Sequence, residues 1–455
     1  MLAAFAIAVG LAGSGKVIDA ELLHEAPGDR RVLIISGLDG ARETATLVKA
    51  EKPERKRFRS TVIAMANPDK AKLQFPPQGQ AYKDNPESHY LWRFILADAP
   101  DLVVIAGPDA GDLSSALTKY VPVVRLDATK GFIRRIRPPT EPSALRVEMR
   151  SRLDRSPRQM AEELARVYGH ELKEAVYIPA VALMGRLRLN YLEDVERIVE
   201  PYRNGKQDSL ARPTASHFSG HLLFADLYRR TKNPQYKALV DKAADLAVKQ
   251  PMHNEMSDWV FMATPLLAAA GRHDDALAQF RFMQKLCLRS DGLYRHSPLD
   301  DAAWGRGNAF PSLGLALALE LTPKDHASYD ELRRAFQNLM AALSQQQDDW
   351  GMWRQVVDRG GSYRELSATS IIAVAMLKGI RLGWLEAKDY QPRVDKAWSA
   401  VKARVASDGT LMDVCESTGK QKSLTDYLHR KAIFDKDPRG GAMALLFATE
   451  MAGLQ

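Results

Sequence analysis

The chain has 455 residues, of which 45% are hydrophobic and 26% are charged. This length and composition exclude both a single small core and an intrinsically disordered protein, so we expect two or three folded domains. The net charge of +8 is spread over short basic runs. Such a distribution fits an anionic substrate, but it lacks the clustered basic face of a nucleic-acid-binding protein.

Sulfur chemistry is limited to Cys287 and Cys415, which permit at most one disulfide. Their spacing does not match a zinc-binding motif, so we expect neither a metal site nor a cofactor built on them. We interpret them as buried free thiols, since free cysteine is among the most buried residue types.

The N-terminus, M-L-A-A-F-A-I-A-V-G-L-A-G-S-G, is an apolar run followed by small residues. It is too short to span a bilayer and is typical of a secretory signal peptide, although basic residues are missing from its start. We therefore expect residues 1–16 to be a signal peptide and the protein to be periplasmic or secreted, with the cytoplasm as the alternative. Residues 10–16, G-L-A-G-S-G-K, have the spacing of a phosphate-binding loop, but Val17 stands where Ser or Thr is needed. We interpret this match as accidental.

Residues 17–137 have the pattern of a small α/β domain. Helical patterns such as residues 89–98 alternate with short apolar runs that predict strands at residues 32–36, 61–66, 102–106 and 121–126. This alternation predicts a parallel sheet with functional loops at the strand ends.

A Pro-rich linker at residues 138–145 separates this domain from a helical one, residues 146–455. No comparable strand pattern occurs beyond the linker. Helices are predicted at residues 156–168, 175–188, 191–202, 216–231, 235–249, 257–271, 273–288, 307–320, 327–346, 366–384, 391–405 and 439–452. Their alternating short and long connections predict a toroid of helical hairpins with the long loops on one rim.

The segment with the densest chemistry is residues 290–310, S-D-G-L-Y-R-H-S-P-L-D-D-A-A-W-G-R-G-N-A-F. Trp304 supplies a flat ring and Arg306 a planar cation, a combination that suits a ligand with a ring face and a carboxylate. The segment therefore predicts a site for an acidic sugar.

The helical half resembles glycoside hydrolase families 88 and 105, the unsaturated uronyl and rhamnogalacturonyl hydrolases. The resemblance rests on stretches in the same order along the chain: residues 258–266, 291–296, 304–308, 350–358, 363–369 and 437–442. It implies an (α/α)6 barrel and an acidic oligosaccharide substrate, which carries a 4,5-unsaturated uronic acid at its non-reducing end. The family adds water to the vinyl ether of that sugar, for which a single acid suffices, whereas ordinary glycoside hydrolysis uses two carboxylates.

By this resemblance Asp258 is the general acid and base. The pattern alone favours a plainer role as a helix N-cap, because Asp258 follows Ser257 and precedes an apolar run. The resemblance further implies that Arg306 binds the uronate carboxylate, that Trp304 stacks on the sugar and that His296 acts near the reacting carbons or tunes Asp258. Core packing for Trp304 and plain solvation for His296 are the alternatives. Trp353 and Tyr363 are weaker candidates for the pocket wall.

Two departures from the family pattern limit this assignment. Residues 216–221, S-H-F-S-G-H, contain no acidic residue where the family often has one, so a second carboxylate is in doubt. Phe310 stands where Trp is common, which alters the expected stacking.

The N-terminal domain resembles, more distantly, the zinc carboxypeptidase and succinylglutamate desuccinylase family, at residues 32–43, 67–69, 75–79, 87–88 and 100–104. Gly40 occupies the position of a zinc-binding His, and Gly107 follows a later strand without a His. Because catalytic zinc needs three protein ligands, we expect a degenerate domain without metal chemistry.

We therefore expect a two-domain hydrolase of unsaturated uronyl oligosaccharides, with no nucleic-acid partner and an oligomeric state that the sequence leaves open. Three alternatives stay open at this point: another (α/α)6 enzyme such as a uronate lyase, a non-catalytic acidic-glycan-binding protein, and a metallopeptidase.

Overall fold

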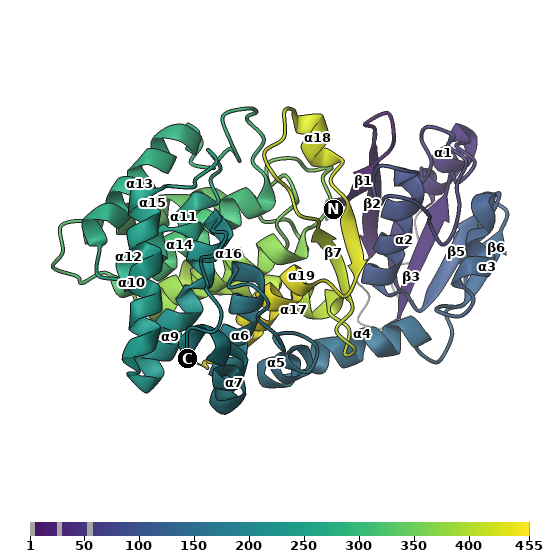
Figure 1. The fold of residues 1–455 in the computed structure, drawn as a ribbon. Helices are drawn as coiled ribbons and strands as arrows, with labels where there is room; N and C mark the ends of the chain where they lie inside the picture. Colours follow the sequence, from purple (N-terminus) through teal and green to yellow (C-terminus); the bar gives the residue numbers. More distant parts are fainter. Residues whose placement is uncertain (1–4, 25–29, 52–57, 455) are drawn as a thin grey trace. The chain divides into compact units, whose positions relative to one another are not determined.

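The computed structural model describes residues 5–24, 30–51 and 58–454. The chain divides into two compact units. The sheet unit comprises Met1–Asp154 with the short segments Arg359–Tyr363 and His429–Ala432, and the helical unit comprises the rest (Figure 1).

The sheet unit is built on a mixed sheet of strand order β1-β2-β4-β3-β5-β6. The strands are β1 (Phe5–Leu11), β2 (Val17–His24), β3 (Arg31–Ser36), β4 (Arg59–Ile63), β5 (Leu102–Ala106) and β6 (Val123–Leu126), and the helices are α1 (Arg42–Ala50), α2 (Pro86–Asp98), α3 (Leu113–Leu117) and α4 (Ala144–Asp154). β4, β3, β5 and β6 run parallel, which confirms the predicted parallel strands. Alternate strand residues such as Val32 and Ile34 pack with Ala45 and Val48 of α1 in one apolar cluster.

The structure differs from the sequence-based expectation at the N-terminus. The apolar run expected to be a signal peptide contains β1, which pairs antiparallel with β2 at the edge of the sheet. β1 lies against α2, where Gly10 leaves the space that the ring of Tyr90 fills. Burial in a sheet accounts for the apolar composition of this segment, and export of the protein stays a prediction.

The G-L-A-G-S-G-K segment is the hairpin that joins β1 to β2, and not a strand-to-helix phosphate loop. The backbone N–H of Ser14 donates to the Asp69 carboxylate at 2.6 Å, and the Lys16 ammonium lies 2.9 Å from the same carboxylate. These donors, with the Ser14 hydroxyl, hold the pKa of Asp69 down to about 2. The interpretation of this motif as an accidental match is confirmed.

The boundary between the units lies later than the Pro-rich linker. Ser143 donates its hydroxyl hydrogen bond to the Pro100 carbonyl at 2.7 Å, and the N–H of Leu145 bonds the Tyr120 carbonyl. α4 therefore belongs to the sheet unit, and the helical unit begins at Arg155.

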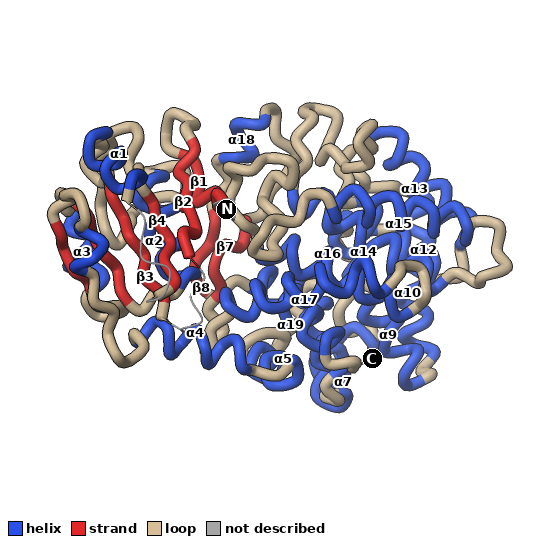
Figure 2. Tube along the Cα trace, turned by 180° about the vertical axis from the view of Figure 1, so that it is seen from behind, coloured by secondary structure: helices blue, strands red, loops and turns tan. Residues whose placement is uncertain are grey.

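The helical unit contains α5 (Pro157–Ala165), α6 (Tyr177–Arg188), α7 (Leu192–Arg203), α8 (Ala215–Gly220), α9 (Leu222–Thr231), α10 (Pro234–Lys249), α11 (Trp259–Met262), α12 (Thr264–Ala269), α13 (His273–Cys287), α14 (Gly305–Leu321), α15 (Tyr329–Ser344), α16 (Leu366–Arg381), α17 (Ala387–Arg404), α18 (Leu424–Leu428) and α19 (Pro438–Met451). Two short strands, β7 (Leu411–Cys415) and β8 (Ala432–Asp435), pair with each other (Figure 2). The sequence did not predict these strands, because β7 is buried on both faces and so shows no alternation, and β8 has only four residues.

The helices form an inner and an outer set. α14, α16 and α19 are buried almost all round, whereas α7, α13 and α15 bury one stripe each, as expected for helices that cover a core. Contacts run in succession from α6 through α9, α12, α14 and α16 to α19, and α19 contacts α6 again. Among the described residues, none of the helices has both the length and the apolarity needed to cross a bilayer.

Buried ion pairs connect the inner helices. Glu450 of α19 is fully buried and lies 2.8 Å from the guanidinium of Arg188 on α6 and 2.5 Å from that of Arg381 on α16. Lys378 of α16 pairs with Glu320 of α14 at 2.6 Å. Each buried charge thus has an opposite partner, as burial in a low dielectric requires.

Candidate active site

Asp258 lies immediately before α11, in helical backbone geometry with φ −52° and ψ −29°. Asp258 thus occupies the N-cap position, as the alternative expects, but its side chain makes no capping hydrogen bond. The carboxyl group is only 13% exposed, and Trp259 and Phe261 beside it are buried. A carboxyl group that is not used for capping, in apolar surroundings, is free for proton transfer.

His296 is the nearest polar side chain to this carboxylate that the sequence analysis singled out. Its Nε2 lies 3.3 Å from Oδ1 of Asp258, and the imidazole is completely buried. The N–H of Ser257 donates to the His296 carbonyl at 2.9 Å and ties the two segments together. The structure therefore joins His296 to Asp258, and the alternative of a solvated histidine is wrong.

The Asp258 carboxylate and the His296 imidazole have unused hydrogen-bonding capacity. Neither Oδ1 of Asp258 nor Nε2 of His296 has a hydrogen bond of good geometry within the described part of the chain. The same holds for the indole N–H of Trp304, whose ring centroid lies 4.4 Å from that of His296. Buried polar atoms are rarely left unsatisfied, and where they converge they mark a functional site.

Trp304 is 1% exposed and stands at the N-cap of α14, so it is packed and not displayed on an open loop. A Cβ at Gly307 would lie 3.1 Å from the Ser257 hydroxyl, 3.3 Å from the indole and 3.4 Å from the imidazole. Glycine at this position thus allows Ser257, His296 and Trp304 to converge. The Gly-rich sequence serves close packing here and does not keep the segment open.

Arg306 is buried, and its guanidinium is engaged by the protein itself. It donates to the carbonyls of Cys415 and Glu416 at 2.6 Å each, and lies 3.9 Å from the Glu365 carboxylate. Its guanidinium carbon also lies 4.7 Å from the Trp304 ring centroid. This geometry favours a role in holding the segment after β7 over direct binding of a uronate carboxylate.

Glu365 is the counterpart of this buried cation and was not singled out by the sequence. It caps α16 by accepting from the N–H groups of Ser367 and Ala368, and it also accepts from the N–H of Cys415 at 2.9 Å. Arg306 and Glu365 therefore fix three stretches of chain in one place.

Trp353 and Tyr363 each have well-defined ring surroundings. Trp353 is fully buried, and its indole N–H donates to the Leu343 carbonyl at 2.8 Å, so it is a core residue. Tyr363 belongs to the sheet unit, where its ring stacks on Tyr82 with centroids 4.8 Å apart. The place of both residues in a pocket wall stays a prediction.

The two departures from the family pattern, the missing acidic residue in residues 216–221 and Phe310 in place of Trp, are both explained by local packing. His221 is fully buried, bonds the Ser209 hydroxyl at 2.9 Å, and has its pKa lowered to about 4 by burial. His217 closes a capping box with Thr214. Phe310 stacks on Phe261 with ring centroids 5.4 Å apart, so it packs within the core of the unit.

The sequence also missed Tyr177 and Tyr427. The Tyr177 ring lies edge-on to Phe261 and Phe310. Burial raises the pKa of Tyr177, although the nearby charges of Arg439 and Arg306 act to lower it. The Tyr427 hydroxyl lies 2.8 Å from Nδ1 of His296. Tyr177 lies in an ordinary helical pattern, and Tyr427 lies on the short helix α18, outside the predicted helices, so no sequence signal marks either residue.

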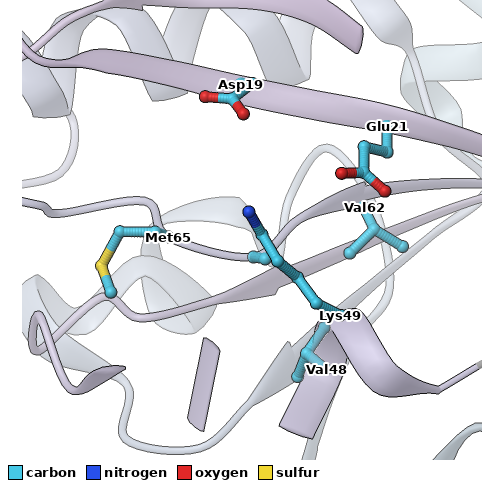
Figure 3. Close-up of a pocket in the computed structure, with 7 residues that line it drawn as sticks. Asp19, Glu21, Val48, Lys49, Val62 and Met65 are labelled. Atoms are coloured by element: carbon cyan, nitrogen blue, oxygen red, sulfur yellow. The ribbon is translucent and has the colours of Figure 1, made fainter. Parts of the chain in front are cut away.

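The residues of this site do not form a metal centre: within residues 5–24, 30–51 and 58–454, no group of three or more His, Cys, Asp or Glu could hold a metal ion. Cys287 and Cys415 are buried and free, which confirms the interpretation of both as thiols. A separate pocket on the sheet unit is lined by Asp19 and Glu21 of β2 and by Lys49 of α1 (Figure 3). It contains none of the residues that the sequence singled out.

The position of α11 depends on a glycine in α14. A Cβ at Gly314 would lie 2.6 Å from the carbonyl carbon of Val260, whose backbone cannot move independently of Asp258. We expect Gly314→Ala to destabilise the protein by about 1–3 kcal/mol, because overpacking outweighs the gain in helix propensity. Urea unfolding checks this expectation. Gly419→Ala is the control, since a Cβ there meets nothing within 4 Å, and equal midpoints for the two variants would contradict it.

Sequence comparison with characterised proteins gives two informative relatives. An unsaturated rhamnogalacturonyl hydrolase of Bacillus subtilis is 31% identical over 124 residues, which cover 27% of this chain and 34% of the relative. An unsaturated 3S-rhamnoglycuronyl hydrolase of Formosa agariphila is 30% identical over 108 residues, 23% of this chain and 29% of the relative. The chain thus spans about a third of the length of these relatives.

Solved structures show the same fold. A glycoside hydrolase of family 105 from C. acetobutylicum has a TM-score of 0.57 at 22% identity and covers 66% of this chain and 99% of its own. A family 88 glycosyl hydrolase from Bacteroides vulgatus has a TM-score of 0.54 at 16% identity, with coverages of 65% and 99%. The family model described as Glycosyl Hydrolase Family 88 matches residues 184–455, which is more than half of the sequence. The chain therefore belongs to glycosyl hydrolase family 88.

Proposed function

We propose that the protein is a glycoside hydrolase that removes a 4,5-unsaturated uronic acid from the non-reducing end of lyase-generated oligosaccharides. Membership of family 88 and the names of the two relatives support this proposal. The observation that carries it is the Asp258 carboxyl group, uncapped and shielded from solvent, 3.3 Å from the His296 imidazole.

In the proposed reaction, Asp258 gives its proton to C4 of the unsaturated sugar. Positive charge then develops on C5 and the ring oxygen, and a water molecule adds its oxygen to C5 while its proton returns to the Asp258 carboxylate. The resulting hemiketal opens to a ketone, and the bond to the next sugar is released. One carboxyl group acts as acid and then as base, so the absence of a paired nucleophile does not prevent turnover.

Within this proposal, His296 supports the charge changes of Asp258, and Trp304 lies against His296. Arg306 holds Glu365 and the segment after β7 in place, and does not itself bind the substrate. We also infer an (α/α)6 barrel. The closed succession of contacts among the inner helices, each backed by an outer helix, supports this architecture.

We infer further that the sheet unit is a carboxypeptidase-like domain without its metal site. The parallel strands β3 and β5 overlap two of the segments on which that resemblance rests, residues 32–43 and 100–104. At Gly40, where the family has a zinc ligand, φ is +73° and a Cβ would lie 2.5 Å from Cγ of Lys70 and 2.9 Å from the Asn67 carbonyl oxygen. A histidine therefore does not fit there without a backbone shift.

The test of the hydrolase proposal follows the absorbance of the conjugated double bond in lyase-generated disaccharides from pectin, ulvan and glycosaminoglycans. We expect the absorbance to fall in proportion to enzyme concentration with at least one of them. Binding by calorimetry without any loss of absorbance would instead identify a non-catalytic glycan-binding protein.

A further inference from the structure

A hydrogen bond connects His296, the neighbour of Asp258, to a tyrosine distant in sequence. The Tyr427 hydroxyl lies 2.8 Å from Nδ1 of His296, on the side of the imidazole opposite to Asp258. Tyr427 is completely buried on the short helix α18. The side-chain amide of Gln355 donates to the Tyr427 carbonyl at 2.7 Å and fixes the backbone at this residue.

The neighbours of the phenol determine where its single proton goes. The backbone N–H of Gln421 donates to the phenol oxygen at 3.1 Å, and the Ser297 hydroxyl is a second hydrogen-bond partner. An amide N–H can only donate, and the two oxygen lone pairs accommodate both neighbours as donors. Burial also raises the pKa of Tyr427 to about 12, so the phenol stays protonated at neutral pH. Its proton is then available to Nδ1 of His296.

A hydrogen bond donated by Tyr427 selects one tautomer of the imidazole. Neutral histidine carries one proton, and if Nδ1 accepts, that proton resides on Nε2. Nε2 is the atom that lies 3.3 Å from Oδ1 of Asp258. The imidazole therefore presents an N–H to the carboxylate, which stabilises the anion that forms when Asp258 gives its proton away.

We propose that Tyr427 is a positioning residue, which holds His296 in the Nε2–H tautomer and in the orientation that supports Asp258 during proton transfer. Only the expected effect of Tyr427 on kcat rests on the proposed function. The tautomer itself is a property of the protein without substrate. Tyr427 touches His296 and not the reacting atoms, so it acts through the imidazole.

The kinetic test compares Tyr427→Phe with Tyr236→Phe. Tyr236, on the outer helix α10, is a matched control. It is also fully buried, and its hydroxyl bonds the Glu196 carboxylate at 3.2 Å. We expect Tyr427→Phe to lower kcat by roughly tenfold, with KM changed less than about twofold, since a transition-state interaction is lost. We expect Tyr236→Phe to retain the wild-type kcat. Equal kcat values for the two variants would overturn the proposal.

The spectroscopic test does not depend on enzymatic activity. Nitrogen-15 NMR of protein labelled at histidine distinguishes the two tautomers, and His296→Gln identifies the signal of His296 among the ten histidines. We expect the Nε2–H form in the wild-type protein and a mixture of forms in Tyr427→Phe. An Nδ1–H form in the wild type would overturn the proposal. If no unsaturated disaccharide is turned over, the proposed function fails, while the NMR result still decides the role of Tyr427.

Discussion

Asp258→Asn is expected to lower turnover of unsaturated uronyl disaccharides by about 10³-fold or more, since general acid and base catalysis is lost entirely. Asparagine has the shape of aspartate but carries no transferable proton. Its amide oxygen takes the place of the carboxylate oxygen that lies 3.3 Å from Nε2 of His296, so we expect the site to keep its geometry and to bind the substrate. Double-bond absorbance measures turnover, and calorimetry with the inactive variant measures binding.

Asp301→Asn is the matched control for this experiment. Its side chain is 78% exposed and pairs with Arg295 at 2.9 Å, so the same change of charge occurs in the same segment without touching the buried site. We expect this variant to keep wild-type turnover. If Asp258→Asn also kept it, Asp258 would have no part in the mechanism.

Arg306→Gln is expected to lower the free energy of unfolding by about 3–5 kcal/mol, because removing one partner leaves the Glu365 carboxylate buried without its cation. The carbonyls of Cys415 and Glu416 lose the guanidinium as a donor in the same variant. Urea unfolding followed by tryptophan fluorescence measures the change.

Arg281→Gln is the control for the loss of an arginine. Arg281 is 59% exposed and pairs with Glu331 on the outer surface of the helical unit, so we expect its replacement to cost less than about 1 kcal/mol. The structural role of Arg306 and direct binding of the uronate carboxylate predict different results for Arg306→Gln. If Arg306→Gln unfolded like the wild type but bound substrate with a much higher KM, the guanidinium would bind the uronate carboxylate directly.

Much of the fold is predictable from local sequence patterns. The strands β3 to β6 follow from short apolar runs bounded by turn residues, and α10, α13 and α15 follow from single apolar stripes. The predicted helix 257–271 is interrupted between α11 and α12, where Pro265 lies in the first turn of the second helix. Apolar periodicity continues across this break, so the pattern alone cannot show it.

The residues of the candidate site are predictable only in part. Asp258, His296 and Trp304 carry chemistry that a motif reveals, and the structure brings all three together. The engagement of Arg306 is not predictable, because its acceptors are backbone carbonyls that any residue at positions 415 and 416 would offer. Tyr427 escapes for a similar reason, since its contact with His296 depends on a chain path 131 residues long.

The N-terminal segment shows the same limit in another form. An apolar run followed by Gly and Ser fits both a signal peptide and an edge strand with a hairpin. In the structure, the hairpin that follows this run is tied to Asp69, which lies 55 residues from Ser14 and accepts its hydrogen bonds. Such a contact between distant segments has no local signature.

In the proposed reaction, one carboxyl group protonates a sugar alkene. This step is tested with a pair of disaccharides that are identical except for the 4,5 double bond. Release of the second sugar from each is measured with the wild-type enzyme. The account predicts release from the unsaturated compound alone, because the saturated one offers no vinyl ether to protonate and needs a second carboxylate. Comparable release from both would contradict it.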